Sequence, residues 1–352
     1  MKNFVFQLIM EQNKILSIII PTYNMEKYLR KCLDSLIVSD ENMERLEVLV
    51  INDGSKDSSS AIGHEYESKY PQTFRVIDKE NGNYGSCINR GLKEATGKYV
   101  KVLDADDYYD NKVLDSFVSY LNSVESDMVL TDYYQINENN QITKEYKFDL
   151  SPDSTFTITD ICTKEIIGRL AHQDITFRTC ILKDMDYHQT EGISYTDNEW
   201  VFKPLVKVSR ITYFPHKLYY YLRGREGQTF DPKVLSKSYG QREVVMRSLL
   251  NYYTALDKDI PSGTVSFLFH RLMRRLTGFY FYHLGFSGTD DSNKSLIAFD
   301  EYVKLINVEV YDALASHKWR LGMRYIKYWR DSNYNMQILP LKMLRWKNKL
   351  KG

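Results

Sequence analysis

KILSIIIPTYNMEKYLRKCLDSLI, residues 14–37, holds the pattern that decides the fold. Its first part, Lys14–Pro21, is a nearly continuous apolar run rich in isoleucine, which is typical of a strand buried on both faces of a parallel sheet. Asn24 then offers an N-cap, and apolar side chains recur after it at helical spacing: Tyr28, Leu29, Cys32, Leu33, Leu36 and Ile37. The stretch therefore predicts a buried strand followed by an amphipathic helix.

The same alternation continues through the next hundred residues. We expect further strands at residues 46–52, 74–78 and 99–103, and helices at 58–69, 86–95 and 113–124. This repetition predicts an α/β fold with a mainly parallel sheet flanked by helices. Later elements are another strand at 127–134, a connection or antiparallel excursion at 137–160, β-like runs at 211–213 and 218–222, and helices from about residue 237.

Composition and length describe a folded protein with two parts. Charged residues make up 26% and apolar residues 43% of the 352, which argues against disorder, collagen and coiled coil. The net charge of +1 is too small to attract the chain as a whole to nucleic acid. We expect an α/β domain over residues 1–230 and a mostly α-helical C-terminal region over residues 231–352. Residues 317–352, the basic aromatic tail, have ten Lys and Arg against Asp331, a net charge of +9, whereas the rest of the chain sums to −8.

Three features bear on the compartment. The four cysteines are widely spaced, so neither a disulfide framework nor a structural zinc site is indicated, and a reducing cytoplasm fits. The opening MKNFVFQLIM closes at Glu11 with no small-residue cleavage site, which argues against a signal peptide. No stretch reaches the roughly 18 to 20 apolar residues that a membrane span needs.

Polar residues follow three of the expected strands at the point where each strand ends. They are Pro21-Thr22-Tyr23-Asn24, Asp53-Gly54-Ser55 and Asp104-Ala105-Asp106-Asp107. Ligands bind beyond the carboxyl ends of strands in open α/β sheets, so these ends predict a site. The carboxylates of the last segment suit Mg²⁺ or Mn²⁺; a solvated acidic loop or a helix cap is the alternative. P-loop and Gly-x-Gly-x-x-Gly motifs are absent from the first strand-helix turn.

Three stretches in this order resemble the inverting glycosyltransferases of family 2, which have the GT-A nucleotide-sugar fold: SIIIPTYNMEKYLRKCLDSL (17–36), VLVINDGSKDSS (48–59) and NGNYGSCINRGLKEATGKYVKVLDADD (81–107). The resemblance is close over about residues 15–125 and looser to about 230. It implies that a sugar passes from a UDP-sugar to the hydroxyl of a saccharide or a lipid-linked saccharide, as in surface polysaccharide synthesis.

The resemblance also implies roles for individual residues. Pro21, Tyr23 and Asp53 would line the uracil and ribose pocket. Asp104 would approach the ribose or the metal, and Asp106 would bind Mn²⁺ or Mg²⁺. A further group would lie toward the diphosphate and sugar: Asn83, Gly85 and Asn89. From the residues alone, Tyr23 could equally pack in the core, Asn83 could form a turn and Asn89 could lie on a helix surface.

Two later segments extend the resemblance. EGISYTDNEWVFKPL (191–205) is similar to the segment that supplies the catalytic base, so Asp197 would be the base, although the family more often has Glu-Asp where this chain has Thr196-Asp197. Glu199 is a rival, and either acid could simply cap a helix beginning near Trp200. In YYYLRGREGQTF (219–230), Arg223 and Arg225 would face the leaving diphosphate, with a solvated β-turn as the alternative.

Other assignments remain open at the level of sequence. His172 and His216 have no partner at metal-ligand spacing, so we expect structural histidines. A sugar-phosphate nucleotidyltransferase and a non-catalytic sugar-binding protein are the alternative functions. The basic aromatic tail either contacts the inner face of the cell membrane peripherally or packs on the acidic body. Pro340 is expected to divide it into two pieces.

Overall fold

The computed structural model describes residues 14–152, 154–225, 238–287, 290–319 and 322–349. The chain forms two compact units, Met1–Ser238 and Tyr239–Gly352. The expected domain boundary at residue 230 and the opening segment considered as a signal peptide lie outside the described residues.

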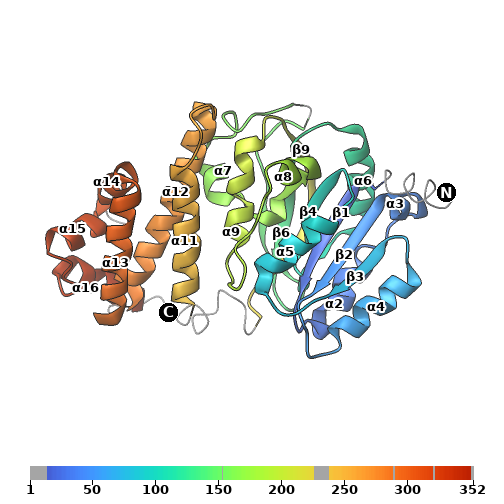
Figure 1. Ribbon diagram of the computed structural model, residues 1–352, viewed down its shortest axis with the longest axis horizontal. Coiled ribbons are helices and arrows are strands. Elements are labelled where there is room, and N and C mark those ends of the chain that lie inside the picture. The colour runs from blue at the N-terminus through green and yellow to red at the C-terminus, as the bar shows by residue number, and fades with distance from the viewer. Residues whose placement is uncertain (1–13, 153, 226–237, 288–289, 320–321, 350–352) are drawn as a thin grey trace. The chain divides into compact units, whose positions relative to one another are not determined.

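One mixed sheet of nine strands forms the centre of the first unit (Figure 1). The strands are β1 (Leu16–Thr22), β2 (Leu46–Asn52), β3 (Phe74–Asp78), β4 (Tyr99–Val102), β5 (Tyr108–Tyr109), β6 (Met128–Ile136), β7 (Ile142–Tyr146), β8 (Ile175–Arg178) and β9 (Ile211–Leu222). Their order is β3-β2-β1-β4-β8-β6-β9-β5, with β7 paired to β6. The first four of these are mutually parallel, as the alternating sequence predicts.

Helices cover both faces of this sheet because the side chains of a buried strand point alternately to either side. Ile18 and Ile20 of β1 share a core with Leu33 of helix α2 and Phe117 of helix α6. Ile19 points the other way, toward α5, and approaches Gly91 so closely that a Cβ there would collide with it. The helices of this unit are α2 (Glu26–Asp34), α3 (Asp40–Arg45), α4 (Ser59–Lys69), α5 (Asn83–Glu94), α6 (Asn111–Ser123), α7 (Lys164–Arg169), α8 (Thr179–Asp184) and α9 (Asp197–Trp200), with short helices η1 (His172–Asp174) and η2 (Lys203–Lys207).

Three strands differ from the sequence-based expectation, among them the two-residue strand β5, which the sequence does not indicate. The sequence does not indicate β8, a four-residue strand that inserts antiparallel between β4 and β6. The two β-like runs at 211–213 and 218–222 are one strand, β9, which runs parallel to β6. Its register against β6 shifts between Phe214 and Lys217, where Pro215 interrupts the ladder because it has no N–H to donate.

The second unit is helical, as predicted. Its helices are α11 (Tyr239–Thr254), α12 (Ser262–Tyr282), η3 (His283–Ser287), α13 (Asp290–Ile306), α14 (Val308–Ser316), α15 (Tyr325–Asp331) and α16 (Leu339–Lys349). The tail forms the last two, and Pro340 lies in the first turn of α16, where a proline is tolerated. Several of its aromatic and apolar residues are buried: Tyr325, Trp329, Leu341 and Leu344. Among the described residues, no helix is long and apolar enough to cross a membrane.

Candidate active site

The ends of four parallel strands, β1 to β4, meet at one edge of the sheet. Thr22 of β1 pairs with Asn52 of β2, and Asn52 pairs in turn with Asp78 of β3. On the other side of β1, Ile19 pairs with Val102, so β4 ends beside β1 just before Asp104. The polar segments that follow the strands therefore start from the same edge.

Asp53 is held in place at the end of β2. Its side chain is buried, and its Oδ1 accepts hydrogen bonds from Lys79 Nζ at 2.5 Å and from the Gly82 backbone N–H at 2.9 Å. Pro21 is partly buried at the end of β1, and Tyr23 is 45% exposed. The exposure of Tyr23 argues against its alternative role in core packing.

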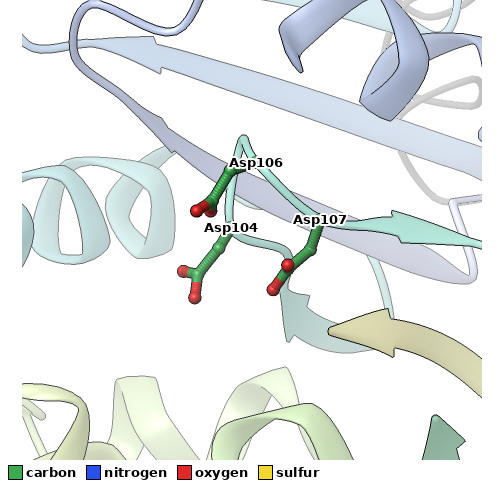
Figure 2. A group of neighbouring side chains, drawn as sticks. All are labelled: Asp104, Asp106 and Asp107. Carbon is green, nitrogen blue, oxygen red and sulfur yellow. The ribbon is translucent and has the colours of Figure 1, made fainter. Parts of the chain in front are cut away.

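Asp104, Asp106 and Asp107 form a cluster on the loop after β4. One carboxylate oxygen of each lies within 4.8 Å of the others. Figure 2 shows the three side chains pointing to the same side of this loop. Carboxylate oxygens are the ligands that Mg²⁺ and Mn²⁺ prefer, so the donor set fits a divalent cation.

Each of the three carboxylates has different protein partners. Asp104 accepts hydrogen bonds from Tyr84 Oη and from His172 Nε2, both at 3.0 Å. Asp107 accepts one at 2.6 Å from the hydroxyl of Tyr219 and one at 2.7 Å from the backbone N–H of Leu222. Asp107 therefore fastens β9 to this loop. Asp106 pairs with Arg225, whose Nε donates to its Oδ2 at 2.6 Å.

The electrostatics of the cluster follow from burial and mutual repulsion. Burial, reinforced by the charges of Asp106 and Asp104, raises the pKa of Asp107 well above its usual range. Burial and the charge of Asp104 also raise the pKa of Asp106, against the opposing effect of Arg225. Burial alone would raise the pKa of Asp104, but its ion pair with His172 and its bond from Tyr84 outweigh burial and lower it. A site that raises the pKa of two clustered acids favours a bound cation.

Asp197 is the first residue of α9 and lies near the same cluster. Its negative charge adds to that of Asp104 in raising the pKa of Tyr84, whose main cause is burial. Burial opposes protonation of His172, but Asp104 and then Asp197 raise its pKa. Asn198 Nδ2 donates to Asp197 Oδ1 at 3.2 Å, and the helix start has no side-chain cap. Plain helix capping therefore does not account for Asp197.

Glu199 has a different environment. It is buried, and Oε2 accepts a 2.6 Å hydrogen bond from the backbone N–H of Thr190. Its Oε1 accepts one from Thr190 Oγ1 at 2.9 Å and one from Lys203 Nζ at 2.7 Å. Glu199 thus supports the 189–191 segment.

Helix α5 is fastened to that same segment. Asn89 Nδ2 donates to the Gln189 carbonyl at 2.9 Å and to Glu191 Oε1 at 2.8 Å, and its Oδ1 accepts from the Gln189 N–H at 2.8 Å. A Cβ on Gly85 would collide with the carbonyl of Thr190. Asn83 begins α5 with φ of 65°, in the left-handed region that asparagine tolerates. These contacts give Asn89 and Gly85 a packing function, rather than leaving Asn89 on the helix surface.

The two arginines after β9 are placed differently. Arg225 is partly buried, pairs with Asp106 and lies 5.5 Å from the ring of Tyr28. Arg223 is exposed; its Nη1 donates to Gln135 Oε1 at 3.4 Å, and its backbone N–H donates to the Ile136 carbonyl at 2.9 Å. Of the two, Arg225 is the one in contact with the cluster.

His172 is a site residue that the sequence does not indicate. It lies on η1, next to β8. Buried Lys101 of β4 holds the backbone there, because its Nζ donates to the carbonyls of Gln173 at 2.8 Å and Ile175 at 3.1 Å. His172 is thus a buried, hydrogen-bonded histidine, and its partner Asp104 belongs to the candidate cluster. The sequence signal for this neighbour is Lys101, because a lysine inside the apolar run before Asp104 needs a polar partner when it is buried.

Comparisons with known proteins match this chain to a glycosyltransferase family and to individual glycosyltransferases. The profile of glycosyl transferase family 2 matches residues 17–182. A poly(ribitol-phosphate) beta-N-acetylglucosaminyltransferase, TarS, of Staphylococcus aureus strain MW2 is 26% identical over 330 residues, which cover 90% of this chain and 54% of TarS. The chain thus spans about half the length of this relative.

Solved structures share the fold. Residues 1–349 of Staphylococcus aureus TarS in complex with UDP-GlcNAc superpose with a TM-score of 0.68 at 20% identity, covering 96% of this chain and 92% of that one. The mannosyltransferase PcManGT of Pyrobaculum calidifontis, in complex with GDP-Man and Mn²⁺, gives 0.50 at 14% identity, covering 94% and 82%. The fold is therefore the GT-A type with a helical C-terminal region.

The matched region contains Asp53, the cluster at Asp104–Asp107 and His172, so it holds most of the candidate site. The family match over residues 17–182, the TarS relative and the shared fold together support a family 2 glycosyltransferase.

Proposed function

We propose that this chain is a metal-dependent inverting glycosyltransferase that moves a hexosyl group from a UDP-sugar to the hydroxyl of a saccharide or lipid-linked saccharide. The observation that carries the proposal is the pair of acidic groups around His172 and Tyr84: the cluster at Asp104–Asp107 and, apart from it, Asp197. Such a pair can serve a leaving diphosphate and an attacking hydroxyl separately.

The donor would lie along the strand ends. Asp53, fixed by Lys79 and Gly82, would bind the uracil, with Pro21 and Tyr23 beside it. Asp104 would face the ribose or the metal, and Asn83 the diphosphate and sugar. TarS was solved with UDP-GlcNAc, so UDP-GlcNAc is the first donor to test.

Asp106 would hold Mn²⁺ or Mg²⁺, with help from the neighbouring carboxylates. When bound, the ion supplies Lewis-acid stabilisation of the leaving diphosphate. Arg225, which pairs with Asp106, is placed to add positive charge at the same position, and Arg223 would lie farther out.

Asp197 would act as the general base. The acceptor oxygen forms a bond to the anomeric carbon as the bond to the diphosphate oxygen breaks, and the electron pair leaves with UDP. The hydroxyl proton passes to the Asp197 carboxylate, which contributes about 10² to 10⁴ in rate. One in-line displacement inverts the anomeric centre.

We place this reaction in the cytoplasm, in surface polysaccharide synthesis. All four cysteines are free thiols, which suits a reducing compartment. The relative named for poly(ribitol-phosphate) modification supports an acceptor of the cell-wall polymer class.

The test is release of UDP from a panel of UDP-sugars with Mn²⁺ and saccharide acceptors. We expect release by the wild type and none by Asp106→Asn. If wild-type protein with a cooperative melt releases no UDP from any donor, the proposal is wrong. Production of pyrophosphate from UTP and a sugar phosphate would instead identify a nucleotidyltransferase, and sugar binding without turnover a binding protein.

A further inference from the structure

We infer that the outer face of α16 is a docking surface for an anionic lipid bilayer. The α16 face consists of Leu339, Lys342, Met343 and Trp346. Leu339 is 69% exposed, Met343 48% and Trp346 62%. These four residues lie at i, i+3, i+4 and i+7, so they form one stripe along the helix.

The opposite side of the same helix is fixed within its unit. Leu341 and Leu344 are buried, and Arg345 donates to the carbonyl of Met336. The helix also packs against η3 and α15. The exposed apolar side chains are therefore presented by an anchored helix, and Trp346 is not left outside by fraying.

Charge indicates which partner covers this face. Residues 332–352 contain five Lys and Arg and no Asp or Glu, and Lys342 lies in the stripe itself. Leucine, methionine and tryptophan beside lysines are typical of helices that lie in the headgroup region of a membrane. Anionic headgroups supply the countercharge, and the acyl boundary takes the apolar side chains.

Other partners fit less well. Two copies meeting through this face would bring their own lysines together, which opposes self-association. A soluble polyanion would satisfy the basic groups but would leave three large apolar side chains in water. A bilayer satisfies both kinds of group.

The test is co-sedimentation of the full chain with vesicles of phosphatidylcholine and phosphatidylglycerol, and with vesicles of phosphatidylcholine alone. We expect binding to the anionic vesicles and much weaker binding to the neutral ones. Leu339→Ser with Met343→Ser and Trp346→Ser should weaken binding at least about tenfold. Lys342→Gln should weaken it about fivefold, which corresponds to ~1 kcal/mol for one charge at an anionic surface.

The matched control is Leu305→Ser with Val308→Ser. These side chains are 82% and 57% exposed in the same unit, outside the α16 face, so we expect unchanged binding. Because all five residues are exposed, melting temperatures should stay at the wild-type value, which separates lost docking from lost folding.

Several results would overturn the inference. One is that the wild-type protein does not bind anionic vesicles, and another is that the triple and control variants lose the same amount of binding. A third is that soluble polyphosphate competes with vesicle binding as strongly in the triple variant as in the wild type. A dimer in gel filtration that the triple variant abolishes would assign the face to a second copy. The assay uses no donor or acceptor, so its failure is distinct from failure of the proposed glycosyl transfer.

Discussion

Asp197 and Glu199 are two residues apart, yet their environments suit opposite purposes. Glu199 is buried with both oxygens bonded to Thr190 or Lys203, which suits support of the chain. Asp197 is partly exposed, and its charge acts on Tyr84 and His172. A general base must be able to reach substrate, so Asp197 is the better candidate.

Asp197→Asn should lower kcat by about 10² to 10⁴ with little change in melting temperature, because it removes the proton acceptor and no structural contact of consequence. Initial rates and thermal melts measure the two effects. Glu199→Gln is the matched variant and should lower the melting temperature, since it weakens a buried ion pair with Lys203. Full activity in Asp197→Asn, with activity lost in a stable Glu199→Gln, would reverse the assignment.

Sequence predicts some of the site residues and not others, and the reason is their distance along the chain. Asp53 directly follows β2, and Asp106 lies on the loop after β4, so the strand-end rule is enough to single them out. His172 contacts Asp104 across 68 positions, and nothing near it in sequence marks the partner. Its place depends on β8, which brings η1 to the cluster.

Among the secondary-structure elements, α5 connects Asp53 and Asp104 to the 189–191 segment. Its start contacts Asp53 through Gly82 and Asp104 through Tyr84, and its middle holds the 189–191 segment through Asn89. The segment is in turn bonded to Glu199, two residues from Asp197. A substitution of Asn89 should therefore affect the position of Asp197, the proposed base.

Asn89→Ala removes three hydrogen bonds and should destabilise the fold by about 2 to 3 kcal/mol, at about 1 kcal/mol each. Thermal melts measure this, with Arg90→Ala on the exposed side of α5 as the control. A variant that melts like wild type but binds the donor less tightly would instead assign Asn89 to the sugar.

His64 links α4 to the end of β3 and makes a pH-dependent contribution to the free energy of unfolding. Its ring nitrogens bond Asp78 Oδ2 at 2.9 Å and Glu67 Oε2 at 2.7 Å, and these acids raise the pKa of His64. The stabilisation is complete below the unfolded pKa of about 6.5 and is lost as pH rises through the folded pKa.

The melting temperature of His64→Gln should therefore lie about 1 to 2 °C below that of wild type at about pH 6. At about pH 8.5 the two melting temperatures should be equal. The effect is small because the group is solvent-exposed. A melting difference that is equal at both pH values would show that the ion pairs contribute nothing.

Some strands can be predicted from the sequence pattern and others cannot. β2 and β3 have the predicted bounds because each is an apolar run closed by polar residues. ITFR in β8 is too short and too polar to stand out, and only pairing with β4 and β6 makes it a strand. In β9, Pro215 divides the apolar pattern although the strand continues past it.

For the whole molecule, the chain divides into two compact units, and the candidate site lies in the first. We expect residues 1–238 to fold alone and to show the same UDP-induced rise in melting temperature with Mn²⁺ as the full chain, because ligand bound to the native state stabilises it by mass action. Loss of the rise in a fragment with a cooperative melt would show that the second unit contributes to nucleotide binding.

The second unit shows that helices are easier to predict than the faces they bury. The sequence predicts helices after residue 237, which are present, and a break at Pro340, whereas the break between α15 and α16 lies at residues 332–338 and Pro340 is inside α16. It does not separate buried Trp329 from exposed Trp346, because both sit among basic residues at similar spacing. Trp329 has a partner far away in sequence, Asn293, whose Oδ1 accepts its indole N–H at 3.0 Å.

The position of β8 has a consequence for biosynthesis. The parallel strands β1 to β4 are complete once residue 102 has been translated, but the neighbour of β4 is encoded more than seventy residues later. A nascent chain therefore exposes an unpaired strand edge beside Asp104 until residue 178 leaves the ribosome. Chaperone capture or premature association of nascent chains should act at that edge during this interval.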